Sequence, residues 1–140
     1  MRSWTILSKQ TTNVPGTGGA LNYYNGIPNT TNIVAQAGAG VYAAQYASDY
    51  SVVSGGVTYN DWYLPSMLEL NMVFNSAAQI SNSMATMGFP APYFLTSNPY
   101  FSSTEYNNST AFMLDFKLGY MQSGGKGASY YTLPVRIATI

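Results

Sequence analysis

Carboxylates are the first candidates for acid–base chemistry in this chain, because the sequence contains no histidine, the commonest general base, and no cysteine. The carboxylates are Asp49, Asp61, Glu69, Glu105 and Asp115. Cleavage of a glycosidic bond needs two carboxylates that face each other in a cleft, and Asp61 with Glu105 is the pair we consider for that role. Carboxylates in proteins are mostly exposed or paired, so we expect structural roles for all of them and predict no catalytic residue.

Metal and thiol chemistry also have few possible ligands here. Without histidine or cysteine, the chain offers no imidazole or thiolate for a transition metal, no thiol nucleophile and no disulfide. Calcium needs about six to eight oxygen ligands, usually several from carboxylates, and the carboxylates are scattered along the chain. We therefore predict no metal site and no cofactor.

Charge is sparse and balanced along the chain. Charged residues make up 7% of the sequence and the formal net charge is zero, whereas an average protein has about 25% charged residues. The scattered Lys and Arg residues form no phosphate-binding surface, so we expect no nucleic acid or polyanion as partner. Polar residues interrupt every apolar stretch, which argues against membrane insertion. The length fits a single domain over residues 1–140.

The elements that position these side chains centre on residues 60–70. The stretch around Trp62 alternates like a short half-buried strand, and Pro65 ends it because proline donates no ladder hydrogen bond. Ser66 lies three residues before Glu69, which is the spacing of a capping box. In that arrangement each side chain accepts a hydrogen bond from the backbone amide of the other residue, and the two bonds together mark the start of a helix. We predict structural roles for Trp62, Pro65, Ser66 and Glu69.

Hydrophobic periodicity predicts two helices around this segment. The first helical region covers Asn29–Tyr50, with an interruption at Gly38–Gly40 and with Thr30 or Thr31 as its cap. The second begins at Ser66 and ends near residue 75 or extends to Ile80. The stretch 77–86 is ambiguous, because its pattern does not distinguish helix from loop.

Alternation and turn residues predict several short strands. Their ranges are 1–8, 21–26, 93–95, 100–104, 111–118, 120–122 and 131–140. The glycine-containing segment 123–128 is predicted to be a flexible tip. Arg136 falls on the predicted strand 131–140, and Glu105 directly follows the predicted strand 100–104. Because charges are rare in this chain, we predict that these two side chains form an ion pair between the strands.

Tyrosine and asparagine supply most of the binding chemistry. Tyr gives a large contact area at small entropic loss, and Asn gives adaptable hydrogen bonds. Turns at 106–109, 118–120 and 123–131 join strands of one predicted antiparallel sheet, and loops on a rigid scaffold commonly carry binding. We predict that they form a binding rim with the candidate residues Tyr106, Asn107, Asn108, Tyr120, Tyr130 and Tyr131, whereas Tyr42, Tyr46, Tyr63 and Tyr93 are predicted core residues.

Five segments of the chain also resemble a known family, and they occur in that family's order. They are Asn29-Thr30-Thr31-Asn32-Ile33-Val34 with Gly38-Ala39-Gly40 and Ala43-Ala44, Asp61-Trp62-Tyr63-Leu64-Pro65-Ser66-Met67-Leu68-Glu69-Leu70, Tyr100-Phe101-Ser102-Ser103-Thr104-Glu105, Ala111-Phe112 and Val135-Arg136. Together they resemble the DUF1566 family, whose best-known member is the C-terminal domain of the Legionella collagen-like adhesin. The resemblance covers roughly residues 22–138.

The resemblance implies an α+β fold of the C-type lectin-like type, with two helices packed on a twisted antiparallel sheet. Enzymes that share this fold, the formylglycine-generating enzymes, work through a cysteine that this chain lacks. Sugar-binding relatives hold calcium through Glu-Pro-Asn and Trp-Asn-Asp motifs, which are also missing. The family adhesin is displayed as a trimer, so the resemblance favours a homotrimer.

These observations favour a non-enzymatic attachment domain. We expect a phage fibre or receptor-binding protein that contacts a glycan or a protein on a host surface. Two alternatives stay open: a structural virion decoration or fibre protein that mainly contacts other virion subunits, and a hydrolase of surface glycans. A neutral polar surface suits a packed assembly, and the N-terminus lacks the apolar core of a signal peptide. The expected location is a virion or the extracellular space.

Overall fold

The computed structural model describes residues 1–139 and has an α+β architecture. Its elements, in chain order, are η1 (Leu7–Lys9), α1 (Gly26–Ala37), α2 (Ala43–Asp49), β1 (Val52–Ser54), β2 (Val57–Tyr59), α3 (Met67–Asn75), α4 (Ala77–Thr86), β3 (Tyr100–Glu105), β4 (Thr110–Asp115) and β5 (Tyr120–Gly125). The predicted α+β class is confirmed. The described residues form four α-helices where the sequence predicted two, and the C-type lectin-like assignment stays a prediction.

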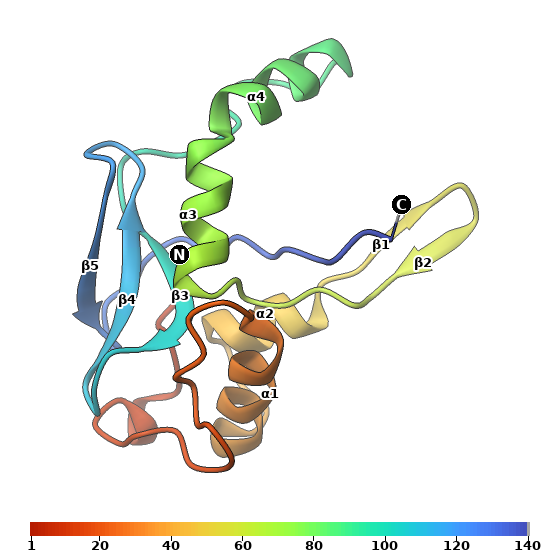
Figure 1. Ribbon diagram of the computed structural model, residues 1–140. Coiled ribbons are helices and arrows are strands. Elements are labelled where there is room, and N and C mark those ends of the chain that lie inside the picture. The colour runs from red at the N-terminus through yellow and green to blue at the C-terminus, as the bar shows by residue number, and fades with distance from the viewer. Residues whose placement is uncertain (140) are drawn as a thin grey trace.

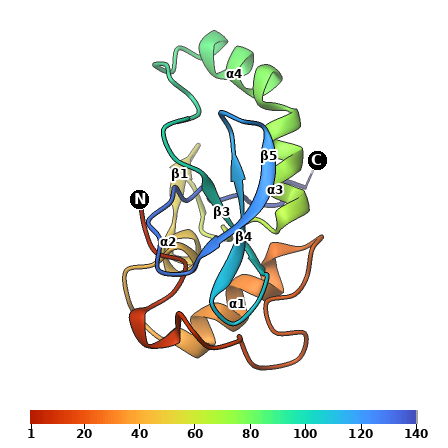
Figure 2. The ribbon, with the colours of Figure 1, turned by 90° about the vertical axis from the view of Figure 1, so that its left-hand side faces the viewer.

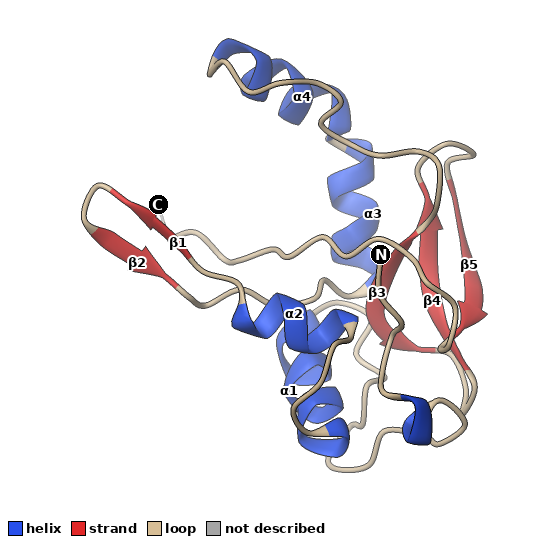
Figure 3. Cartoon of the chain, turned by 180° about the vertical axis from the view of Figure 1, so that it is seen from behind, coloured by secondary structure: helices blue, strands red, loops and turns tan. Residues whose placement is uncertain are grey.

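Two small antiparallel sheets contain the strands. β3, β4 and β5 form a meander in which Thr110 pairs with Gly125 and Asp115 with Tyr120. β3 joins β4 with a register shift between Phe101 and Glu105. β1 and β2 form a separate hairpin that projects from the body of the molecule (Figure 3). Its turn uses glycines with positive φ, as two-residue hairpin loops require.

The helices gather on the β3 side of the meander. In Figure 1, β5 lies at the outer edge, whereas β3 lies next to α1 and α3. The view in Figure 2 agrees, with β5 in front and the helices at the back or side. Every residue of β3 is buried, because this strand lies between β4 and the helices α1 and α3. α4 extends away from the sheet (Figure 1) and has no buried residue.

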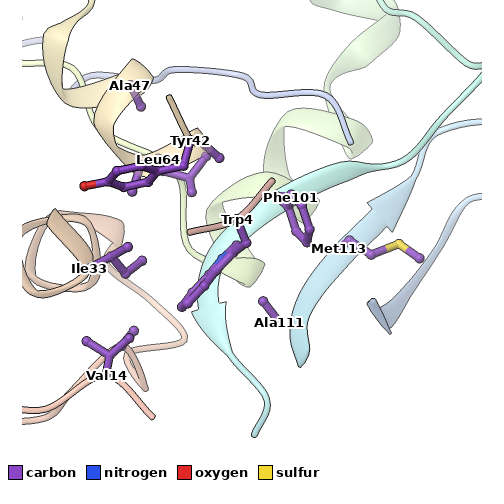
Figure 4. Close-up of a cluster of buried hydrophobic side chains, with 12 residues drawn as sticks. Trp4, Val14, Ile33, Tyr42, Ala47, Leu64, Phe101, Ala111 and Met113 are labelled. Carbon is purple, nitrogen blue, oxygen red and sulfur yellow. The ribbon is translucent and has the colours of Figure 1, made fainter. Parts of the chain in front are cut away.

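The larger core cluster joins the N-terminal segment, α1, α2 and the sheet. Trp4 is fully buried at its centre, among Ile33, Tyr42 and Phe101 (Figure 4). The indole N–H of Trp4 donates to the carbonyl of Ser102 at 2.8 Å, which satisfies its buried polar group. The first residues of the chain are therefore part of the core that supports β3.

A second cluster covers the other part of β4. It contains Leu70 from α3 together with Tyr100, Leu114 and Phe116. A two-residue alternation over the predicted strand 111–118 puts Phe112 on the same face as Leu114 and Phe116, but Phe112 is half-buried and outside both clusters. β4 ends at Asp115, so Phe116 belongs to the following turn, yet it packs in the same cluster as Leu114.

Four of the predicted strands are not strands in the structure. Segments 1–8, 21–26, 93–95 and 131–139 lack ladders, and residue 140 lies outside the described part of the chain. The ends of the chain instead make isolated bridges, in which Arg2 pairs with Tyr130 and Val135 pairs with Tyr63. The predicted strand around Trp62 is likewise reduced to the single Tyr63 bridge. Alternation alone cannot show whether a partner strand runs alongside for more than one residue.

The helix boundaries also differ from the predicted ones. α1 begins at Gly26, because the side chain of Asn25 caps it by accepting the amide of Ile27 at 2.9 Å. Pro28 lies in the first turn, where an amide hydrogen has no helical partner and proline is tolerated. The predicted cap Thr30 instead accepts the amide of Leu64 at 3.1 Å. The predicted interruption at residues 38–40 is confirmed, and the ambiguous stretch 77–86 forms α4.

None of the helices formed by residues 1–139 is long and apolar enough to cross a membrane.

Candidate functional site

An open groove of about 680 Å³ lies where the glycine-rich N-terminal loop meets the β3–β4 turn. Most of its lining residues are glycines or have polar side chains, and the exceptions are Val14, Leu21 and Tyr106. The full lining is Asn13, Val14, Gly16, Gly18, Gly19, Leu21, Glu105, Tyr106, Asn107 and Asn108. Three of these, Tyr106–Asn108, are predicted binding residues. The structure therefore places half of the predicted binding set in one concave site.

The loop that forms one wall of the groove depends on glycine. Gly19 has a φ of +51°, and a Cβ there would lie 2.6 Å from the carbonyl oxygen of Val14. Only glycine fits such a close approach in the left-handed region. Asn32 of α1 donates from its side chain to the carbonyl of Gly19 at 2.7 Å. α1 therefore braces this wall against the rest of the fold.

The opposite wall is the turn between β3 and β4. The side-chain oxygen of Asn107 accepts the amides of Ser109 and Thr110, each at 2.9 Å, which fixes the turn as an Asx motif does. Asn108 is exposed beside it, and Tyr106 is 57% exposed. The Tyr106 ring packs edge-on against Phe112, with 5.2 Å between ring centroids. The turn thus presents one aromatic ring and one amide from a fixed backbone.

Glu105, which lines the groove, is one partner of a buried ion pair. Lys126 Nζ donates to Glu105 Oε2 at 2.6 Å, and the two side chains are 0% and 3% exposed. The same Oε2 accepts the amide of Val14 at 3.0 Å, while Lys126 also donates to the carbonyl of Thr12 at 2.9 Å. The pair therefore ties the glycine-rich loop to β3. Burial lowers the pKa of Lys126, and the Glu105 carboxylate partly opposes that shift.

The predicted ion pair between Glu105 and Arg136 is wrong. Arg136 instead forms a two-pronged contact with Asp61, with Nε–Oδ1 at 2.7 Å and Nη2–Oδ2 at 3.0 Å. The hydrogen bond from Arg136 lowers the pKa of Asp61. The closing segment bridges β3 at Tyr131 and then pairs with Tyr63 through Val135, which places Arg136 beside Asp61 rather than beside Glu105. Glu105 pairs instead with Lys126, which lies in the segment predicted to be a flexible tip.

The two carboxylates considered as a glycosidase pair do not share a cleft. Glu105 lines the groove described above, whereas Asp61 lines a different cavity with Trp62 and Tyr63. Each is also held by its own basic residue. In addition, no group of three or more acidic side chains close enough to hold a metal ion occurs within the part of the chain that the structure describes.

The other three predicted binding residues lie elsewhere. Tyr120 is 45% exposed, but it begins β5, at the end of the sheet opposite the β3–β4 turn. Consecutive turns of an antiparallel meander alternate between its ends, so the predicted turns do not form one rim. Tyr130 and Tyr131 are half-buried rather than exposed, with rings 4.7 Å from Phe101 and 5.1 Å from Tyr100. Their rings pack against core residues.

The predicted capping box is confirmed. Ser66 Oγ accepts the amide of Glu69 at 3.3 Å, and Glu69 Oε2 accepts the amide of Ser66 at 2.8 Å. The same Glu69 oxygen accepts the amide of Gly26 at 2.9 Å, and Tyr63 donates its hydroxyl to the other oxygen at 3.0 Å. Glu69 therefore joins the start of α3 to the start of α1.

The remaining residues of the central segment also have structural positions. Trp62 is half-buried and donates its indole N–H to the carbonyl of Tyr59 at 3.0 Å. Its ring meets Tyr50 edge-on at 5.1 Å. Pro65 is buried, and its carbonyl accepts the amide of Ser103 in β3 at 2.7 Å. The segment before α3 is thus held against the central strand.

An aromatic strip extends the groove along the sheet, and the sequence did not predict it. Phe112 contacts Tyr106 on one side and Tyr23 on the other, with 6.0 Å between the centroids of Phe112 and Tyr23. Tyr23, Tyr24 and Phe112 line a shallow hollow of about 240 Å³ together with two residues of α3. The Tyr23-Tyr24 pair beside two asparagines was the available sequence signal. We call the groove and this strip the groove face.

Two comparisons with known proteins bear on this chain. A family model described as the Lcl C-terminal domain matches residues 5–136, which is nearly the whole sequence. The match includes all five segments that carry the resemblance to the DUF1566 family, and it confirms that resemblance. No curated protein matches the chain.

Proposed function

Because the chain belongs to the Lcl C-terminal domain family, we propose that it is a non-enzymatic attachment domain that binds a molecule on a cell surface, a glycan or a protein, through the groove face. The family is adhesin-type, which is compatible with an adhesion role. One observation carries the proposal: the groove combines an exposed tyrosine and exposed amides on a braced backbone. Aromatic rings and amides of this kind are typical of binding surfaces.

The charge pattern supports the same proposal. Glu105 is the one charged residue that lines the groove among residues 1–139, and its charge is compensated by Lys126. Attachment through such a surface should depend little on ionic strength, because screening acts on interactions between exposed charges. A polyanionic ligand would instead need a basic surface.

A cell-binding experiment tests the proposal with matched variants. Labelled protein is incubated with a panel of bacterial cells, and retained protein is measured for wild type, Tyr106→Ala and Tyr120→Ala. Both tyrosines are exposed, but they lie at opposite ends of the sheet. We expect Tyr106→Ala to lower retention and Tyr120→Ala to leave it unchanged. Equal retention of all three proteins, or loss with Tyr120→Ala alone, would contradict a role for the groove face.

A structural role in a particle is the second candidate, and α4 favours it. This helix has no buried residue. Beside it, a largely apolar cavity of about 330 Å³ is lined by Ile80 and Met84 of α4 and by Trp62 and Leu133, among others. An apolar helix face of this kind suits contact with another subunit. On this proposal the protein forms a homo-oligomer, a trimer by the family resemblance, in a virion or another extracellular assembly.

Light scattering distinguishes this second candidate. If α4 joins subunits, wild-type protein has the mass of an oligomer and Met84→Glu reduces it to that of a single chain. The control is Asn82→Glu, which adds the same charge at an exposed position of the same helix. A wild-type monomer at all concentrations would exclude self-assembly through α4.

A further inference from the structure

The two oxygens of the Glu105 carboxylate have different surroundings. Oε2 accepts hydrogen bonds from Lys126 and Val14, whereas Oε1 accepts none from residues 1–139. Oε1 is not completely buried, so it keeps some contact with solvent. Glu105 is almost fully buried and is one of the residues that line the groove, so we infer that Oε1 meets solvent through the groove.

This oxygen is a strong acceptor in a site with no net charge. Hydrogen bonds to an ionised carboxylate are stronger than those between neutral groups, and a partly desolvated oxygen gains more from a donor than one in bulk water. The ammonium of Lys126, 2.6 Å from Oε2, offsets the charge of the carboxylate. An anionic ligand would be repelled by Glu105, and a cationic ligand would be opposed by the ammonium of Lys126. The groove therefore favours a neutral ligand that carries hydrogen-bond donors.

The walls of the groove fit a ligand with both hydroxyl groups and apolar C–H faces. Tyr106 offers an exposed ring on one side, and Asn13 and Asn108 offer exposed amides that both donate and accept. The glycine-rich wall has no side chains at Gly16, Gly18 and Gly19, so a ligand can approach its backbone closely. The volume of about 680 Å³ lies within the range of small-molecule sites, about 300–1,000 Å³.

We propose that the groove binds a neutral saccharide, with one sugar hydroxyl donating to Glu105 Oε1 and one sugar face packed against Tyr106. This inference deepens the proposed attachment function, because it names the ligand class of the same site. It requires no metal ion, since the carboxylate oxygen itself receives the hydroxyl. Lys126 is a positioning residue that holds the carboxylate in place and does not touch the sugar.

The experiment is a titration of isotopically labelled protein followed by amide chemical shifts. The probes are the methyl glycosides of glucose, galactose, mannose and fucose, N-acetylglucosamine, and glucose 6-sulfate as an anionic comparison. We expect at least one neutral probe to shift the amides of residues 16–19 and 106–108 in a saturable manner. Glucose 6-sulfate should bind more weakly than neutral glucose. A result in which no neutral probe shifts these amides, or only the sulfated probe does, would overturn the proposal.

Three variants locate the binding within the site. Glu105→Gln presents a donor or a weaker acceptor to the groove and should weaken binding by about tenfold or more. Asn13→Trp fills the groove from an exposed position without touching the ion pair and should abolish binding. Asn60→Trp adds the same indole at an exposed position outside the groove and should bind as wild type. If Glu105→Gln does not fold, wild-type affinity in Asn13→Trp still refutes the proposal.

The outcome separates this inference from the attachment function. If cells retain the wild-type protein while no neutral saccharide binds, attachment stands and the ligand class is wrong. If a neutral saccharide binds in the groove while no cell surface retains the protein, the ligand class stands and the attachment function is wrong.

Discussion

Replacing Lys126 by methionine tests the buried ion pair that supports the groove. Methionine keeps an unbranched apolar stem beside Trp4, whose ring centroid lies 4.8 Å from the ammonium. The substitution removes the charge that offsets Glu105 and leaves its carboxylate with the single amide of Val14. It also removes the donor to the carbonyl of Thr12, which lies in an exposed residue and can turn to water.

The expected magnitude follows from the burial of both partners. Removing one member of a buried pair leaves an uncompensated charge and costs about 3–5 kcal/mol. In a chain of 140 residues, this corresponds to a fall of about 10–20 °C in the melting midpoint. The double variant Glu105→Gln with Lys126→Met leaves no buried charge, and glutamine still accepts the Val14 amide. We expect it to cost less than Lys126→Met alone.

Urea unfolding followed by circular dichroism measures these free energies. The control Lys117→Met removes an exposed ammonium and should change the free energy of unfolding by less than about 0.5 kcal/mol. The reasoning fails if Lys126→Met is no more destabilising than Lys117→Met. It also fails if the double variant loses as much as the sum of its two single variants, because the pair would then have no coupling energy.

Three further predictions concern other parts of the fold. Ser66→Ala should lower the free energy of unfolding by about 1 kcal/mol, measured in urea, because it removes a helix cap; an unchanged midpoint would contradict the capping box. Burial, followed by the Glu69 charge, raises the pKa of Tyr63 above 10.0, so its contribution to stability is present below pH 10 and is lost as pH rises further. Tyr63→Phe should therefore reduce the loss of stability between pH 10 and 11, and a slope equal to wild type would refute this. A chelator should leave the melting midpoint unchanged, whereas a fall of several degrees would reveal a metal site.

Features encoded within a few residues were predictable from the sequence. Ser66 and Glu69 form the expected capping box, because its two hydrogen bonds depend only on a spacing of three residues. Likewise, the glycines at 38–40 end the first helix as expected. The start of α1 at Gly26 was missed although its cap, Asn25, is a local signal; only the hydrogen bond from the Gly26 amide to Glu69 depends on a residue far along the chain.

Features that depend on tertiary contacts were not predictable in this way. Lys126 lies among glycines that suggest a flexible tip, but the fold brings it against Glu105 and Trp4. The predicted closing strand makes only isolated bridges. The path that it takes brings Arg136 against Asp61 instead of Glu105. The pairing of charges depends on which distant segments of the chain lie side by side in the fold. Hydrophobic periodicity contains no information on that.

Part of the predicted binding set lies in the candidate groove. Tyr106–Asn108 were identified from their turn composition, and they line the groove. The other wall was missed, because nothing local indicates that the loop at residues 13–21 folds against this turn. Tyr130 and Tyr131 are half-buried instead of forming part of an exposed rim, because the segment after β5 turns back over Phe101 and Tyr100.

The most direct test of the central claim is the retention of Asn13→Trp and Asn60→Trp on a cell surface that binds the wild-type protein. The first indole fills the groove, and the second lies at an exposed position outside it. If the groove face is the attachment surface, Asn13→Trp is lost from the cells while Asn60→Trp is retained like wild type. Full retention of a folded Asn13→Trp protein would contradict the claim.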